Sequence, residues 1–102
     1  MPAASQPSPA IAPIPLSADE ASIIKDSVLQ FFGESAVLRN FSSSPSRIDI
    51  HVETDRDIGM AKYDCLGVIL THLDRPIGLE VTRRGMRIRG TAKLAYRNGV
   101  IF

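Results

Sequence analysis

The segment RIDIHVE, residues 47–53, alternates between polar and apolar side chains at every position. The apolar residues are Ile48, Ile50 and Val52, and the polar residues between them are Asp49, His51 and Glu53. A period of two is typical of a β-strand with one buried face and one wet face. The segments before and after it have the period of an α-helix instead. The chain is therefore predicted to combine helices with a sheet, in an α+β fold.

The helix before this strand is predicted to span residues 18–32. Ser17 and Glu20 have the spacing of a capping box, in which each side chain accepts a hydrogen bond from the other residue's backbone N–H. Gly33 can adopt the left-handed conformation that ends a helix. The apolar residues at helical spacing are Ala21, Ile24, Val28, Phe31 and Phe32. We expect a short strand at 36–41 to follow, and a turn at 42–46.

A second helix is predicted from Ile58 to Leu73. Its apolar stripe consists of Ile58, Ala61, Cys65, Val68, Ile69 and Leu73. Thr54, Asp55 and Asp57 are the candidate capping residues before this helix. Pro76 follows the stripe and is a usual signal for the end of a helix.

The C-terminal stretch VTRRGMRIRG, residues 81–90, is predicted to form a β-hairpin. Its two-residue turn would be Arg84-Gly85, because glycine adopts a positive φ without strain. Alternation then predicts a further strand through Ala92, Leu94 and Tyr96. The dipeptide Asn98-Gly99 indicates another turn, after which residues 100–102 would add a short edge strand.

These elements predict a single α+β domain at residues 17–102, in the order α-β-β-α-β-β(-β). Two helices would cover one face of a four- or five-stranded sheet, and the other face would be open. Residues 1–16 contain five of the seven prolines and no charged side chain, so we expect a disordered proline-rich tail. This tail lacks the basic start and apolar core of a signal peptide. No apolar run is long enough to span a bilayer, and a cytoplasmic location is expected.

The charges divide unevenly along the chain. Residues 1–74 carry five basic and ten acidic side chains, whereas residues 75–102 carry seven basic and one acidic. The basic hairpin is therefore a candidate surface for RNA or a ribonucleoprotein. Its candidate contact residues are Arg83, Arg84, Arg87, Arg89, Lys93 and Arg97. Two alternatives stay open: the two halves neutralise each other, or the open sheet face or C-terminal edge strand binds a protein partner or a second copy.

The residues that carry catalysis in other proteins do not form a convincing set here. Asp49, His51 and Glu53 lie on one strand face, but successive side chains on that face are nearly 7 Å apart at strand rise, so one strand cannot close a tight metal site alone. Cys65 lies on an apolar helix stripe, where an inert buried thiol is expected. A single cysteine also excludes a Cys-x-x-Cys zinc site within this sequence. We therefore predict a non-enzymatic protein without a metal or other cofactor.

Residues 18–85 resemble the N-terminal domain of the ribosome maturation factor RimP. In that family a strand leads through acidic residues to a helix with an Asp-Cys pair, then Leu-Asp, then a strand reading Leu-Glu-Val. The pairs Asp64-Cys65 and Leu73-Asp74 and the triplet Leu79-Glu80-Val81 match those pieces. The family's Ser-Pro-Gly turn is replaced by residues 82–85, Thr-Arg-Arg-Gly. The resemblance implies an α+β domain that contacts the small ribosomal subunit.

Overall fold

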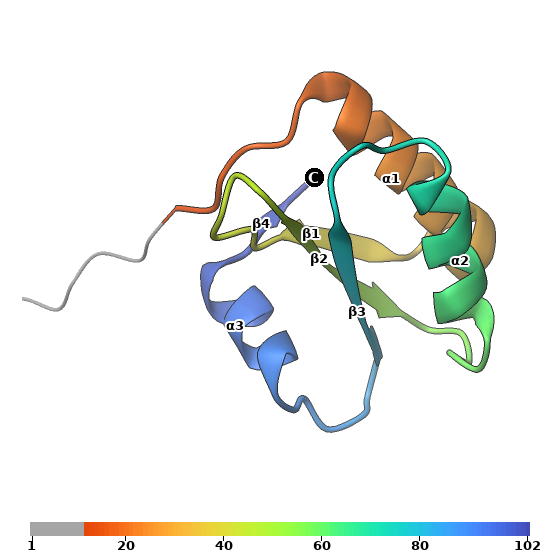
Figure 1. Ribbon diagram of the computed structural model, residues 1–102. Helices are drawn as coiled ribbons and strands as arrows, with labels where there is room; N and C mark the ends of the chain where they lie inside the picture. The colour runs from red at the N-terminus through yellow and green to blue at the C-terminus, as the bar shows by residue number, and fades with distance from the viewer. Residues whose placement is uncertain (1–11) are drawn as a thin grey trace, which may run out of the picture.

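A computed structural model describes residues 12–102 and shows a four-stranded mixed sheet with three helices (Figure 1). The elements are α1 (Ala18–Phe32), β1 (Val37–Asn40), β2 (Ile48–Thr54), α2 (Ala61–Leu70), β3 (Ile77–Arg83), α3 (Thr91–Asn98) and β4 (Val100–Ile101). The strand order is β3-β2-β1-β4. β2 and β3 are parallel, and β1 is antiparallel to both β2 and β4.

Most of the predicted tail, residues 1–11, lies outside the described residues. Residues 12–16 have no regular secondary structure. Two hydrogen bonds nevertheless hold this segment against the sheet. The Ile14 N–H donates to the Ser42 carbonyl at 2.9 Å, and the Asn40 side-chain amide donates to the Ile14 carbonyl at 2.8 Å.

The capping box predicted for α1 is confirmed. The Glu20 N–H donates to Ser17 Oγ at 3.1 Å, and the Ser17 N–H donates to Glu20 Oε1 at 3.0 Å. The helix ends at Phe32, where Gly33 follows with a φ of 88°. These bonds satisfy backbone donors that have no partner inside the helix, so the sequence determines where α1 starts.

The buried core lies between the sheet and the two helices α1 and α2. The alternation predicted for β2 is confirmed on this side, since Ile48, Ile50 and Val52 are fully buried. The rest of the core is Ile24, Val28, Phe32, Leu38, Cys65, Ile69, Ile77 and Leu79. α2 is shorter than predicted and begins after Met60 without a side-chain cap. Two of its candidate caps, Asp55 and Asp57, pair with arginines instead.

The predicted C-terminal hairpin is wrong. β3 ends at Arg83, the Met86 N–H donates to the Arg83 carbonyl, and residues 91–98 form the helix α3 rather than a strand. The sequence TAKLAYRN contains alanine, lysine, leucine and arginine, which favour helix. Ala92 and Ala95 are spaced by three residues and are both buried. The alternation of Ala92, Leu94 and Tyr96 concealed this helical spacing.

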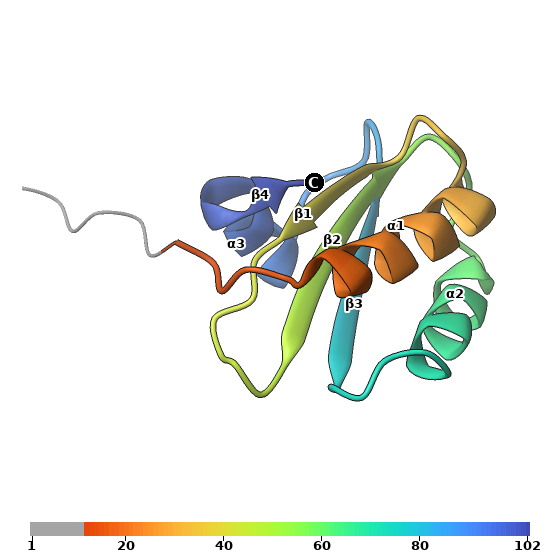
Figure 2. The same ribbon diagram turned by 90° about the horizontal axis from the view of Figure 1, so that it is seen from above.

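The third helix also corrects the predicted open sheet face. α1 and α2 lie on one side of the sheet and α3 lies on the other (Figure 2). The order is α-β-β-α-β-α-β, and the segment after β3 crosses the sheet to reach β4 at the opposite edge. The predicted C-terminal edge strand is present as β4. No helix in residues 12–102 is long and apolar enough to cross a membrane.

Candidate binding surface

A network of polar side chains lies between α3 and the sheet, with Glu53 at its centre. Oε1 of Glu53 accepts from Arg39 at 3.0 Å and from the Tyr96 hydroxyl at 2.9 Å. Oε2 accepts from Arg84 at 2.8 Å. The hydrogen bond from Arg84, followed by those from Tyr96 and Arg39, lowers the pKa of Glu53 to about 2 despite its partial burial. The Arg39 guanidinium also lies 4.3 Å from the centre of the Tyr96 ring.

His51 lies in the same layer and is fully buried, which corrects its predicted position on a wet face. Its Nε2 is 2.9 Å from Thr82 Oγ1, and its ring meets Tyr96 edge-on at 4.8 Å. Nδ1 has no hydrogen-bond partner among the described residues. Burial, and then the charge of Arg39, lower the pKa of His51 to about 4, against smaller opposing effects of Glu53 and Glu80. His51 is therefore neutral at pH 7 and serves the packing of α3.

Cys65 is buried in the core, and this burial raises the pKa of its thiol to about 11. The thiol is therefore protonated at neutral pH and is a weak nucleophile. Across residues 12–102, no three side chains of histidine, cysteine, aspartate or glutamate are grouped as metal ligands. Asp49, the remaining residue of the polar row, pairs with Arg47 at 2.9 Å.

The six basic candidates divide into two groups. Arg83 pairs with Asp57, and Arg84 pairs with both Glu53 and Asp55, at 2.8 and 2.6 Å. The other four are exposed and form no salt bridge within residues 12–102. These four, here called the basic face, are Arg87, Arg89, Lys93 and Arg97. The structure places them on the loop after β3 and on α3, since the hairpin that was to hold them is absent.

Two of the four residues of the basic face lie on α3. Lys93 and Arg97 are four residues apart and share one side of this helix. Between Val81 and Phe102 the sequence contains no acidic residue. Nothing in this C-terminal segment itself neutralises the four cations, so they are free to attract an external anion.

A groove of about 580 Å³ adjoins the basic face, and the sequence did not reveal it. Its floor is the C-terminal half of β3, residues 80–83. One wall is formed by residues 57–59, which precede α2, and the other by Met86, Arg87, Arg89 and Ala92. The one sequence signal for this groove was Met86, an apolar residue between arginines. In the structure Met86 is 63% exposed. An exposed apolar side chain beside cations suits a ligand with both apolar and acidic groups.

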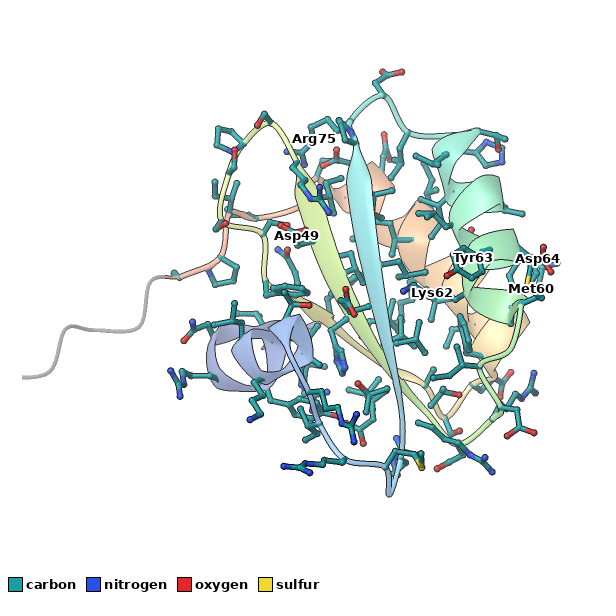
Figure 3. The ribbon with its side chains drawn as sticks, turned by 60° about the horizontal axis from the view of Figure 1, so that its bottom comes forward. Asp49, Met60, Lys62, Tyr63, Asp64 and Arg75 are labelled. Atoms are coloured by element: carbon teal, nitrogen blue, oxygen red, sulfur yellow. The ribbon has the colours of Figure 1, made fainter. Side chains whose placement is uncertain are left out.

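A second exposed apolar feature lies at the first turn of α2, where Met60, Lys62, Tyr63 and Asp64 gather (Figure 3). Met60 is 67% exposed and Tyr63 is 60% exposed. The Lys62 ammonium is 5.8 Å from the centre of the Tyr63 ring. Both apolar residues fall outside the buried stripe of α2, so their exposure follows from the helical period.

Comparison of the chain with protein-family models, with curated proteins and with solved structures found no match.

Proposed function

We propose that this domain is a small, non-enzymatic cytoplasmic binding module that contacts RNA or a ribonucleoprotein through the basic face. One observation carries the proposal: Arg87, Arg89, Lys93 and Arg97 are exposed and form no salt bridge within residues 12–102. Arg83 and Arg84, which were candidates on sequence grounds, leave the proposed contact set because carboxylates already hold them.

The resemblance to the RimP family supports the same proposal. The order of α1, β1, β2, α2 and β3 is the order that the resemblance implies for residues 18–85. A contact with the small ribosomal subunit would be a contact with a ribonucleoprotein. The basic face lies entirely beyond the resembling segment, so the two lines of support are separate.

The test is an NMR titration of amide shifts with a short structured RNA at low and at physiological salt. If each of the four cations neutralises one phosphate, raising the salt from about 50 to about 200 mM should weaken binding roughly 50- to 150-fold. The double variants Arg87→Glu with Arg89→Glu, and Lys93→Glu with Arg97→Glu, should each abolish the shifts. Lys25→Glu, an exposed charge reversal on α1, is the matched control and should leave them unchanged. Absence of shifts at low salt overturns the proposal.

One observation favours a second candidate function, which is homodimerisation through β4. Val100 and Ile101 are 54% and 62% exposed on an edge strand that, within residues 12–102, pairs only with β1. Exposed apolar edges template strand pairing with another chain. Sedimentation of the protein and of Ile101→Lys over a range of concentrations tests this candidate. A dimer that is lost in the variant supports it, whereas a monomer at high concentration contradicts it.

A further inference from the structure

The outer edge of β3 carries backbone groups near its C-terminal end that are available to another strand. Two hydrogen bonds show which residues of β3 direct their backbone groups toward β2. The Ile48 N–H donates to the Pro76 carbonyl at 2.9 Å, and the Arg84 N–H donates to the Thr54 carbonyl at 2.7 Å. Since residues of a strand alternate in direction, the even-numbered residues of β3 direct their N–H and C=O groups toward β2. The odd-numbered residues direct theirs to the free edge. These are Ile77, Leu79, Val81 and Arg83.

Of these outward groups, only the Arg83 carbonyl has a hydrogen-bond partner among the described residues, namely the Met86 N–H. The N–H and C=O groups of Val81 and the N–H of Arg83 have none within residues 12–102. Ile77 and Leu79 are buried, so the accessible part of the edge is Val81 and Arg83. Proteins usually protect a long edge strand with a bulge, a proline or a covering element. β3 is seven residues long and contains no proline.

The groove described above lies along this same edge. Val81 and Arg83, two of the outward-directed residues, line its floor. Ile58 and Met86 provide apolar surface on opposite walls. An extended chain in the groove would therefore meet backbone donors and acceptors along one side and apolar side chains above and below. This arrangement fits strand addition, in which main-chain bonds give affinity and wall pockets give specificity.

The charge of the groove selects the occupant. Arg83 already pairs with Asp57 across one end of the groove, and Glu80 also lines it. Arg87 and Arg89 form no salt bridge within residues 12–102, so the groove keeps a net positive charge. Residues 1–16 of the chain carry no charged side chain and contain five prolines, which lack the N–H that a ladder needs. This tail is therefore a poor match for the groove. An acidic segment of another protein matches both the backbone groups and the two arginines.

We propose that the β3 edge groove binds an extended acidic peptide segment of a partner protein by adding it to the sheet beside β3. The peptide's backbone pairs with the N–H and C=O groups of Val81 and with the N–H of Arg83. An apolar side chain packs against Ile58 or Met86, and a carboxylate pairs with Arg87 or Arg89. This site overlaps the proposed RNA contact at Arg87 and Arg89 and differs from it in using the β3 edge.

The probe is a phage-displayed library of random twelve-residue peptides, selected on the full chain. We expect proline-free sequences with alternating apolar residues and at least one aspartate or glutamate. A selected peptide is then synthesised with one N-methyl group at each position in turn. Strand addition predicts a loss of roughly fivefold or more in affinity at alternate positions and little change at the positions between them. A selection without acidic peptides, or N-methyl effects without a period of two, overturns the proposal.

Val81→Pro tests the protein side, because it removes an outward N–H without touching the bonds to β2. We expect the affinity for the peptide to fall at least roughly fivefold, while Ile101→Pro, on the edge strand β4, leaves it unchanged. Binding that survives Val81→Pro overturns the proposal. If Val81→Pro does not fold, the N-methyl series and Arg87→Glu with Arg89→Glu decide the question with folded protein.

The same variants separate this site from the other occupants. Lys93→Glu with Arg97→Glu should weaken RNA binding but not peptide binding, and Val81→Pro should do the reverse. If Val81→Pro weakens RNA binding as much as peptide binding, the groove belongs to nucleic acid and the peptide proposal fails. A dimer in sedimentation that Val81→Pro dissociates assigns the edge to a second copy of the chain and overturns the proposal as well.

Discussion

Replacement of Glu53 by glutamine should destabilise the fold by an amount that depends on pH. The carboxylate accepts hydrogen bonds from Arg39, Arg84 and Tyr96, and these lower its pKa from 4.5 to about 2. A difference of this size between the folded and unfolded chain corresponds to about 3 kcal/mol of stability at neutral pH. The side chain of Arg84 is 38% exposed, so solvent screens part of its interaction. We therefore expect Glu53→Gln to lose about 2 kcal/mol at pH 7.

The sign of the pH dependence follows from the lowered pKa. The stabilisation is complete above pH 4.5, where the carboxyl is ionised in both states, and is lost as the pH falls toward 2. Urea unfolding of both proteins at pH 7, 5, 4 and 3 (roughly evenly spaced through the transition) measures the difference directly. The difference in unfolding free energy between the two proteins should fall to less than half of its value at pH 7 by about pH 3. A gap that stays constant from pH 7 to 3 would show that the charge of Glu53 does not stabilise the fold.

Three further predictions concern other parts of the fold. The pKa of His51 falls from 6.5 to about 4 on folding because the ring is buried, so the stability of the fold should drop as the pH falls from 6.5 to 4. His51→Gln should remove that drop in urea unfolding, and an unchanged drop would refute the prediction. Arg75, just before β3, donates to both carboxylate oxygens of Glu20 at 2.8 and 2.9 Å and to the Pro45 carbonyl at 2.8 Å (Figure 3). Arg75→Gln should lower the free energy of unfolding by about 1–3 kcal/mol. A loss below about 0.5 kcal/mol would contradict this prediction. A Cβ on Gly99 would lie 2.3 Å from the Ala95 carbonyl oxygen, whereas a Cβ on Gly67 would meet nothing within 4 Å. In thermal unfolding, Gly99→Ala should therefore be destabilised, and Gly67→Ala should be stabilised by about 0.5–1 kcal/mol. Equal effects of the two substitutions would refute the steric reasoning.

The parts of the fold that sequence reasoning predicted are those whose signals are local. Ser17 and Glu20 determine the start of α1 through bonds within one turn, and the isoleucines of β2 alternate because one face is buried. The C-terminal third depends on partners far away in the sequence. Residues 81–90 satisfy a hairpin pattern, but β3 pairs with β2 instead, about 29 residues earlier in the chain. Period-two and helical readings of residues 92–96 both fit, and only packing against the sheet distinguishes them.

The candidate site was predicted by residue type but not by arrangement. The basic residues of the C-terminal segment were identified from charge alone. Asp55 and Asp57 lie beyond the end of β2 and form salt bridges with Arg84 and Arg83. No short-range pattern in the sequence links these aspartates to the two arginines, so the sequence did not show which basic residues lack a salt bridge. His51 was assigned to a wet face because α3 was read as a strand. The edge groove requires the order of strands in the sheet, which alternation does not specify.

The crossing from β3 to β4 has a consequence for the order in which the molecule assembles. α1, β1, β2, α2 and β3 supply every residue of the buried core cluster, and residues 84–102 then add α3 on the other face and β4 at the edge of the sheet. This last segment contributes only Ala92 and Ala95 as fully apolar buried residues, with the Glu53 network beside them. We therefore expect this segment to form a separate cooperative unit that docks late in folding and opens before the rest. Since the basic face lies on this unit, a bound polyanion would slow amide exchange in α3 while leaving exchange in α1 unchanged.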